Sequence, residues 1–223
     1  MKPSILLVTK EGDTYAQAAA DFLTKNFDDC TILAGTRAQK FPEEGHQWEG
    51  DYIISYLSPW IIGEEVLQKA RAAAINFHPG PPQYPGIGCT NFAIYDGVDG
   101  FGITCHHMAR KVDTGQIIAV KRFRIYETDS VLTLTRRCYG HILALFYDIA
   151  SLILDGEPLP ESEETWTRKP YTRKELNALG RITADMTDAE VRRRIRAMLY
   201  PDAPGAYIEI AGARFDYSGG NGS

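Results

Sequence analysis

The stretch from Ala73 to Gly88, AAINFHPGPPQYPGIG, constrains the fold more than any other part of the sequence. It begins as an apolar strand. Four prolines and three glycines then occupy seven of the ten positions from Pro79 to Gly88, so neither helix nor regular strand can continue. Asn76 and His78 stand two residues apart at this break, and side chains in a strand alternate between faces. Both should therefore point to the same side at the carboxyl end of a buried strand, where open α/β sheets bind ligands.

The residue types at this break suit acyl transfer. Asn76 offers an uncharged NH2 donor that can face an oxyanion, and His78 can accept the proton of an attacking nucleophile near neutral pH. The alternative is purely structural, with Asn76 capping the turn and His78 packed as an ordinary histidine.

Apolar runs and helical periodicity alternate along the first half of the chain. This alternation predicts an α/β fold, a mostly parallel twisted sheet with helices on both faces. The first strand-to-helix turn, TKEGDT, contains one glycine and matches neither a dinucleotide fingerprint nor a phosphate-binding loop. Strands are predicted at 5–9, 31–34 and 51–57, and helices at 14–27 and 64–74, the last leading into the strand that holds Asn76.

A second polar position follows the proline-rich loop. A helix is predicted at 90–96 and strands at 100–107 and 117–120. Asp113 lies in the connection between these two strands, directly before Thr114 and Gly115, which signal a turn. Its carboxylate is the candidate to accept a hydrogen bond from His78 and raise the basicity of the imidazole. The alternative is that Asp113 only closes an Asx-turn.

The rest of the chain differs in character. A long amphipathic helix is predicted from Ser130 to Leu154, and a polar, proline-bearing linker at 158–173. The chain is thus divided into a catalytic core at 1–157 and a C-terminal extension at 158–217, with a tail at 218–223 that is expected to be disordered. Within the extension, Thr187 and Glu190 are expected to form a capping box on a helix over 187–199, and a small hairpin is expected within 201–215.

The composition and charge of the chain argue against several classes of function. The 223 residues carry a net charge of -5 and no basic stripe, which argues against nucleic-acid binding. The four cysteines form no C-x-x-C pair, so the sequence predicts no metal site and a reduced, cytoplasmic compartment. The first ten residues have too short an apolar run for a signal peptide, and no segment was expected to have the apolar length of a membrane span.

Three separated motifs resemble those of the formyltransferases that use 10-formyltetrahydrofolate. They are the Asn-x-His pair with its proline-containing loop, the run Gly102-Ile103-Thr104-Cys105-His106, and Asp113-Thr114-Gly115. The resemblance covers roughly residues 1–160. It extends to the N-terminal domain of methionyl-tRNA formyltransferase, which is related to these enzymes. It implies a Rossmann-like core, 10-formyltetrahydrofolate as formyl donor, and Asn76, His78 and Asp113 as the catalytic residues.

The resemblance also implies a folate site. The loop LSPWII, residues 57–62, matches the position where the family holds the pterin ring, largely through backbone groups. From the residues alone, this loop is either a flat apolar rim for an aromatic ring or a hydrophobic staple under the next helix. The expected folate contacts are Trp60, Ile61, Ile62, His106, Lys111 and Val112.

Within the family, the chain is most similar to the sugar N-formyltransferases. It lacks the glycine-rich loop of glycinamide ribonucleotide transformylase and the basic C-terminal domain of methionyl-tRNA formyltransferase. The resemblance therefore implies a nucleotide-linked amino sugar as acceptor, a role in lipopolysaccharide O-antigen biosynthesis, and a possible homodimer that binds neither nucleic acid nor membrane. The alternatives are a formyltransferase that acts on methionyl-tRNA or another amine, a formyltetrahydrofolate hydrolase, and a non-catalytic folate-binding module.

Overall fold

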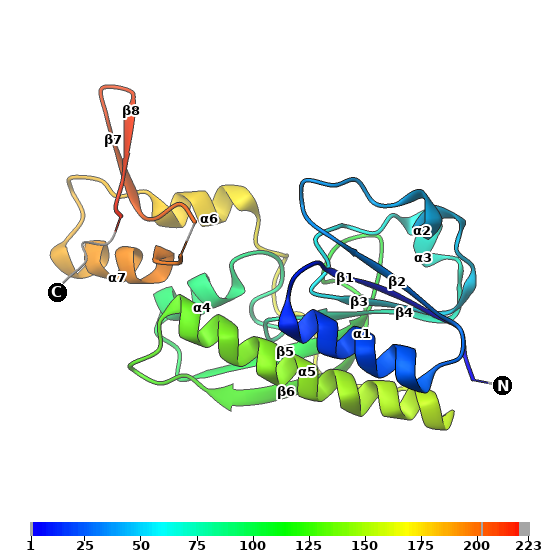
Figure 1. The fold of residues 1–223 in the computed structure, drawn as a ribbon. Coiled ribbons are helices and arrows are strands. Elements are labelled where there is room, and N and C mark those ends of the chain that lie inside the picture. Colours follow the sequence, from blue (N-terminus) through cyan, green and yellow to red (C-terminus); the bar gives the residue numbers. More distant parts are fainter. Residues whose placement is uncertain (1, 202, 219–223) are drawn as a thin grey trace.

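A six-stranded sheet forms the centre of the protein, as seen in a computed structural model that describes residues 2–201 and 203–218 (Figure 1). The strand order is β2-β1-β3-β4-β5-β6, in which the first four strands are mutually parallel and the last two run antiparallel to their neighbours. Three of the five strand pairings are parallel, so the predicted α/β class with a mostly parallel sheet is confirmed. The strands are β1 (Ile5–Lys10), β2 (Cys30–Gly35), β3 (Gly50–Tyr56), β4 (Ala70–His78), β5 (Gly100–His107) and β6 (Ile117–Arg124).

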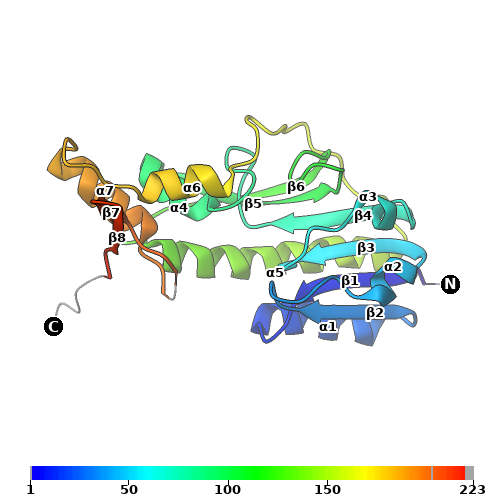
Figure 2. The same cartoon turned by 90° about the horizontal axis from the view of Figure 1, so that it is seen from above.

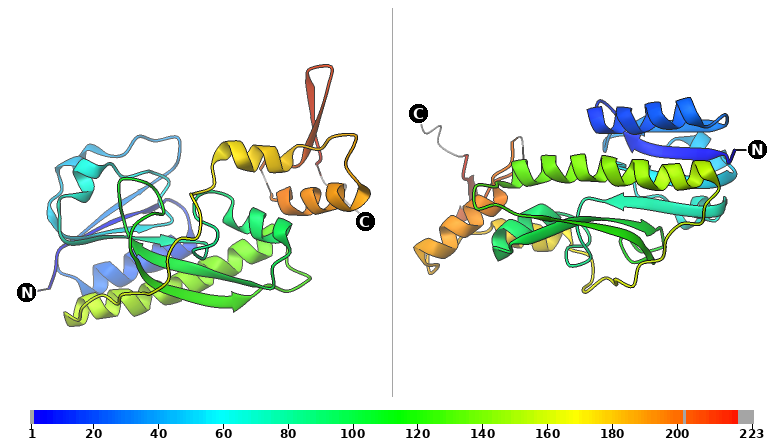
Figure 3. Two further views of the ribbon diagram at one scale, coloured as in Figure 1. Left: turned by 180° about the vertical axis from the view of Figure 1, so that it is seen from behind. Right: turned by 90° about the horizontal axis from the view of Figure 1, so that it is seen from below.

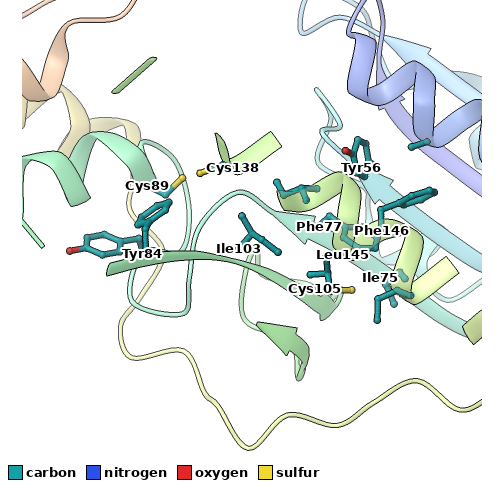
Figure 4. Close-up of a cluster of buried hydrophobic side chains, with 14 of the residues drawn as sticks. Tyr56, Ile75, Phe77, Tyr84, Cys89, Ile103, Cys105, Cys138, Leu145 and Phe146 are labelled. Atoms are coloured by element: carbon teal, nitrogen blue, oxygen red, sulfur yellow. The ribbon is translucent and has the colours of Figure 1, made fainter. Parts of the chain in front are cut away.

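Two helices, α1 (Thr14–Asn26) and α5 (Val131–Asp155), cover one face of the sheet. Asp13 caps α1 by accepting hydrogen bonds from two backbone N–H groups, and a reciprocal capping box between Ser130 and Thr133 begins α5. The main core lies between these helices and the sheet. Figure 4 shows Phe77 of β4 close to Phe146 of α5, with ring centroids 5.6 Å apart.

The opposite face is covered unevenly. Two short helices, α2 (Glu43–Gln47) and α3 (Glu64–Leu67), cover part of it over a small second cluster of apolar side chains. Farther along the sheet, residues 157–172, here called the crossing segment, run without helix or strand from the end of α5 to the next helix (Figure 3, left). Figure 2 shows that the crossing segment and α5 lie on opposite sides of β5 and β6.

The C-terminal extension packs on α4 (Cys89–Asp96) and adds no separate core. It consists of α6 (Arg173–Gly180), α7 (Asp188–Met198) and a hairpin of β7 (Tyr207–Ile210) and β8 (Ala213–Asp216). Its buried side chains belong to the same hydrophobic cluster as the sheet: Leu176, Leu179, Ala197, Met198 and Ala206. Residues 219–223 of the expected disordered tail lie outside the described residues.

The predicted helix over 64–74 was wrong. The helix ends at Leu67, and the chain enters β4 at Ala70, where pairing with β3 begins. Alanine has high helix propensity, but the hydrogen bonds that β3 offers on its open edge outweigh that preference here. The capping box of α7 forms only in part, because Thr187 accepts from the Glu190 N–H while the Glu190 carboxylate binds Tyr95 and Arg194 instead.

Two further elements were missed, α2 and α6, and β6 is longer than predicted. The expectation that no segment has the length and composition of a membrane span also fails for α5. Nine of its apolar residues are buried, at the spacing of one helix face, which is the pattern of a core helix: Val131, Leu134, Cys138, Ile142, Leu145, Phe146, Ile149, Ala150 and Ile153.

Candidate active site

The predicted pair lies at the end of β4. Ile75 and Phe77 are buried in the main core, and the alternation of the strand turns Asn76 and His78 to the other face of the sheet. The antiparallel register with β5 places His106 beside Asn76 and Thr104 beside His78. Two neighbouring strands therefore present four polar side chains on one face.

The proline-rich loop folds around His78. The Thr104 hydroxyl donates to the Gly80 carbonyl at 2.8 Å, which holds the first turn of the loop against the sheet. A Cβ at Gly80 would lie 2.7 Å from His78 Nε2, so this turn leaves room for no side chain. His78 Nε2 lies 2.9 Å from the Tyr84 carbonyl, and because a carbonyl only accepts, Nε2 carries the proton.

Asp113 reaches the pair from the loop between β5 and β6. Its backbone has a φ of 48°, a left-handed conformation that is costly for a residue with a side chain. Two residues later, a Cβ at Gly115 would lie only 1.8 Å from the His107 carbonyl oxygen, so only glycine permits this close return of the chain. The Asp-x-Gly motif is thus needed to close the turn that brings Asp113 to the site.

The Asp113 carboxylate joins both histidines. One oxygen, Oδ2, lies 3.2 Å from His78 Nδ1 and accepts the Gly86 N–H at 2.7 Å, and the other, Oδ1, lies 3.2 Å from His106 Nε2. All three side chains are buried. Burial alone would raise the pKa of Asp113, but the positive charges of His78 and His106 in their protonated forms, the hydrogen bond that protonated His106 donates and the one from the Gly86 N–H lower it to about 2.

His106 holds the Asn76 carboxamide. Its Nδ1 donates to the His107 carbonyl at 2.8 Å, so in the neutral ring Nε2 is an acceptor. Asn76 Nδ2 lies 3.1 Å from this Nε2 and can donate one of its two hydrogens to it. The second N–H of Asn76 is then left to stabilise a developing oxyanion.

The proton-accepting position of His78 follows from the same reasoning. With the Nε2 proton held by the Tyr84 carbonyl, the free lone pair is on Nδ1, beside the Asp113 carboxylate. A proton accepted there is stabilised by the negative charge of Asp113. The structure therefore brings together a base, its orienting carboxylate and a neutral hydrogen-bond donor, as the sequence predicts for Asn76, His78 and Asp113.

The residues of the LSPWII loop differ in burial, which bears on whether the loop is a ligand rim or a hydrophobic staple. Ile62 is 9% exposed and packs in the small second cluster, while Trp60 is half-buried against that cluster and donates from Nε1 to the Gln39 carbonyl at 2.8 Å. Ile61, in contrast, is 79% exposed and offers its whole side chain to a ligand. The hydrophobic staple thus describes Trp60 and Ile62, while a ligand contact at Ile61 stays a prediction.

The second segment expected to bind folate lies near the first. Met108 packs on the same cluster as Trp60 and Ile62, and Arg110 pairs with Glu64 at 3.8 Å across the two segments. Lys111 and Val112 are exposed, whereas His106 is buried in the hydrogen-bond network described above. Their contacts with folate remain predictions.

Sequence reasoning missed one aromatic residue of the site, Trp166 in the crossing segment. Its indole lies edge-on to the imidazoles of His78 and His106, at centroid distances of 5.8 and 5.0 Å. The segment reads as a linker because it is polar and contains prolines. A tryptophan in such a stretch was the available signal, since a large aromatic side chain is seldom left unburied.

The lowered pKa of Asp113 predicts how stability depends on pH. Asp113 binds protons more weakly in the folded than in the unfolded protein, so it stabilises the fold above pH 4 and this contribution is lost as the pH falls toward 2. A shift from 3.8 to about 2 corresponds to about 2 kcal/mol. Urea unfolding of the wild type and Asp113→Asn at pH 7, 5, 4 and 3 should show a difference that shrinks with acid. A difference that stays constant over this range would contradict the prediction.

Comparison with known proteins shows which family this chain is part of. Residues 16–141, more than half of the chain, match the formyl transferase family. The chain belongs to this family. The site residues Asn76, His78 and Asp113 all lie within the matched range. The GDP-perosamine N-formyltransferase of Brucella melitensis is 28% identical over 184 residues, which cover 80% of this chain and 68% of the relative.

Solved structures of other formyltransferases share the fold. A 4-N formyltransferase from Francisella tularensis matches with a TM-score of 0.76 and 16% identity, covering 96% of each chain. An N-formyltransferase from Helicobacter canadensis, solved with folinic acid and dTDP-3-aminofucose, matches with a TM-score of 0.72 and 17% identity, covering 95% of this chain and 85% of the other. At 16–17% identity, these structural matches show that this formyltransferase and the two solved proteins share a fold.

Proposed function

We propose that the protein transfers a formyl group from 10-formyltetrahydrofolate to the amino group of a nucleotide-linked amino sugar. The observation that carries the proposal is the buried His78–Asp113 pair beside Asn76, within a chain of the formyl transferase family. The Brucella relative is named for a GDP-linked amino sugar, and the Helicobacter neighbour was solved with a folate and a dTDP-linked one. Both support an acceptor of this class.

The donor is proposed to lie along the exposed edge formed by Ile61 and Val112. These two side chains offer apolar contact for the flat pterin ring, and both are exposed in the protein. Backbone groups of the LSPWII loop and of residues 111–113 supply polar contacts there. The formyl group of a donor bound there is proposed to lie at Asn76, two residues before His78 on β4.

The chemical steps follow from the site. The neutral amine of the sugar attacks the formyl carbon, and the free N–H of Asn76 stabilises the oxyanion that forms. His78 Nδ1 takes the amine proton, and Asp113 stabilises the imidazolium. The bond between the formyl carbon and N10 then breaks, N10 takes the proton that His78 had accepted, and tetrahydrofolate leaves. The sugar amine has become a formamide.

Turnover with a panel of acceptors tests the proposal. The protein is mixed with 10-formyltetrahydrofolate and with UDP-, dTDP- or GDP-linked amino sugars, and release of tetrahydrofolate is followed with and without each sugar. Release that requires one sugar, with a mass increase of one formyl group on it, is the expected result. Release that ignores every sugar would instead identify a hydrolase, and folate binding without any release would identify a binding module.

The hairpin of β7 and β8 supports a homodimer within this proposal. Its register places Ile208 opposite Phe215 and Ile210 opposite Ala213, so one face of the hairpin is apolar. The side chains of Ile210 and Phe215 are exposed on that face, and the hairpin itself projects away from the rest of the protein (Figure 1). Two copies packed through these faces would remove them from water.

Light scattering after size exclusion tests the dimer. The wild type is expected at twice the chain mass of 24.9 kDa, and the double variant Ile210→Asp, Phe215→Asp at the mass of one chain. Glu209→Gln, on the polar face of the hairpin, is the matched control and should remain dimeric. A wild type that elutes as a monomer would overturn this part of the proposal.

The proposal includes a reduced, cytoplasmic location and delivery of the product to lipopolysaccharide O-antigen biosynthesis. The thiols of Cys89, Cys105 and Cys138 are buried and unpaired, and burial raises their pKa, so they are unreactive. Such thiols fit a reducing compartment. Fractionation of cells that express the protein and analysis of O-antigen sugars in a deletion strain would test these two points.

A further inference from the structure

We propose that Trp166 is a positioning residue that keeps water from the formyl group, so that the formyl passes to the amine and not to water. This inference rests on the proposed function. The indole stands nearly perpendicular to both imidazoles of the site, at 73° to His78 and 88° to His106. One aromatic side chain thus covers the base and the residue that holds the oxyanion donor.

The indole is fixed in place by the turn that carries Asp113. Its Nε1–H donates to the Gly115 carbonyl at 2.8 Å, two residues beyond Asp113. Trp166 therefore contacts all three parts of the site: the base, the residue that holds Asn76, and the loop that supplies the carboxylate. A movement of the indole would change the position of each.

The crossing segment is bound on both sides of the site. The Ser162 N–H donates to the Ile117 carbonyl in β6 at 3.1 Å, and the Thr167 N–H donates to the Pro82 carbonyl in the proline-rich loop at 3.2 Å. Farther on, the Tyr171 N–H donates to the Pro85 carbonyl at 2.8 Å. These hydrogen bonds hold the crossing segment at three points along its path across the sheet, which Figure 3 (left) shows.

The indole held over the two histidines matters because water competes with the amine. In the competing reaction, a water oxygen bonds to the formyl carbon, the bond to N10 breaks, N10 takes a proton, and formate and a proton leave. The same base and the same oxyanion donor would assist this reaction. A site that transfers formyl efficiently must therefore exclude water from the faces of His78 and Asn76 that the amine does not occupy.

Part of the indole is exposed, so it can also contact an acceptor. Trp166 is half-buried, in contrast to the buried His78 and His106 beneath it. Its inner edge covers the imidazoles while its outer surface is left to contact an incoming sugar. Trp166 therefore sets which nucleophile reaches the base.

The test measures the ratio of formate to formylated sugar. Wild type, Trp166→Ala and Trp166→Phe are given 10-formyltetrahydrofolate and the amino sugar that the wild type accepts, and both products are quantified. Trp166→Ala is expected to raise the ratio at least about tenfold. Trp166→Phe retains an aromatic edge over both imidazoles and should stay within about threefold of the wild type.

A matched control separates this role from a structural one. Trp48→Ala removes a half-buried indole that packs at Gly50, where β3 begins, and so at the end of the parallel strands opposite to Asn76 and His78; it should keep the wild-type ratio even if it lowers stability. Thermal unfolding of every variant confirms that it is folded at the assay temperature. If Trp166→Ala keeps the wild-type ratio, whatever its rate, the inference is overturned. If the wild type forms no formylated sugar, the proposed function itself fails.

Discussion

Replacing His78 with glutamine is expected to lower kcat by about 10²–10⁴-fold, the range for loss of a general base. Glutamine retains an N–H that can donate to the Tyr84 carbonyl, so the proline-rich loop keeps its anchor. It has no lone pair that takes a proton at neutral pH, so the amine proton has no acceptor beside Asp113. Tetrahydrofolate release at saturating donor and acceptor measures the loss.

The control for this variant is another histidine outside the site. His141 on α5 stacks on Phe123, at a centroid distance of 4.1 Å, and His141→Gln should turn over as the wild type does. Both variants should unfold at temperatures close to the wild type if glutamine fills the space of each ring. A His78→Gln protein that is folded and keeps wild-type turnover would remove His78 from the mechanism.

The positions of the candidate catalytic residues Asn76 and His78 were predictable because local rules govern them. The alternation of a strand is enough to place Asn76 and His78 on one face, and the proline-rich loop fixes where that strand ends. Asp113 was harder, since its turn signal shows only that the chain bends. The reason that it reaches His78 lies in a close approach of Gly115 to the His107 carbonyl, which a sequence does not display.

The parts that could not be predicted depend on contacts between distant segments. The stretch around Ala70 has the composition of a helix, and it becomes a strand because β3 lies beside it. The crossing segment has no periodicity, so its sequence resembles a linker, and its position is set by hydrogen bonds to Ile117, Pro82 and Pro85. Trp166 was missed for this reason.

The LSPWII loop shows a different limit. Its apolar residues are equally compatible with a ligand rim and with a hydrophobic staple. Which of the two roles a residue takes depends on the direction of its side chain after β3 ends. The chain leaves β3 with Leu57 in a left-handed conformation, at a φ of 52°, and this turn sets the directions of the residues that follow. Ile61 then faces solvent while Ile62 is buried two residues before α3.

Replacing Asn76 with alanine is expected to lower kcat by about 10²–10³-fold, or roughly 2.7–4 kcal/mol in the barrier, as for other oxyanion donors. The KM for the donor should change little, because the N–H of Asn76 acts on charge that develops only in the transition state. Steady-state kinetics with the accepted amino sugar measures both constants. A loss confined to KM would mean that Asn76 binds substrate and stabilises no transition state.

The orientation of Asn76 by His106 makes this prediction sharper. If His106 acts only by holding the Asn76 carboxamide, then His106→Gln lowers kcat in the wild type but adds nothing to Asn76→Ala, since the group that it holds is already absent. If His106 acts independently through Asp113, the two losses multiply. The double-variant cycle therefore decides which of its two contacts at Nε2, with Asn76 or with Asp113, matters in the reaction.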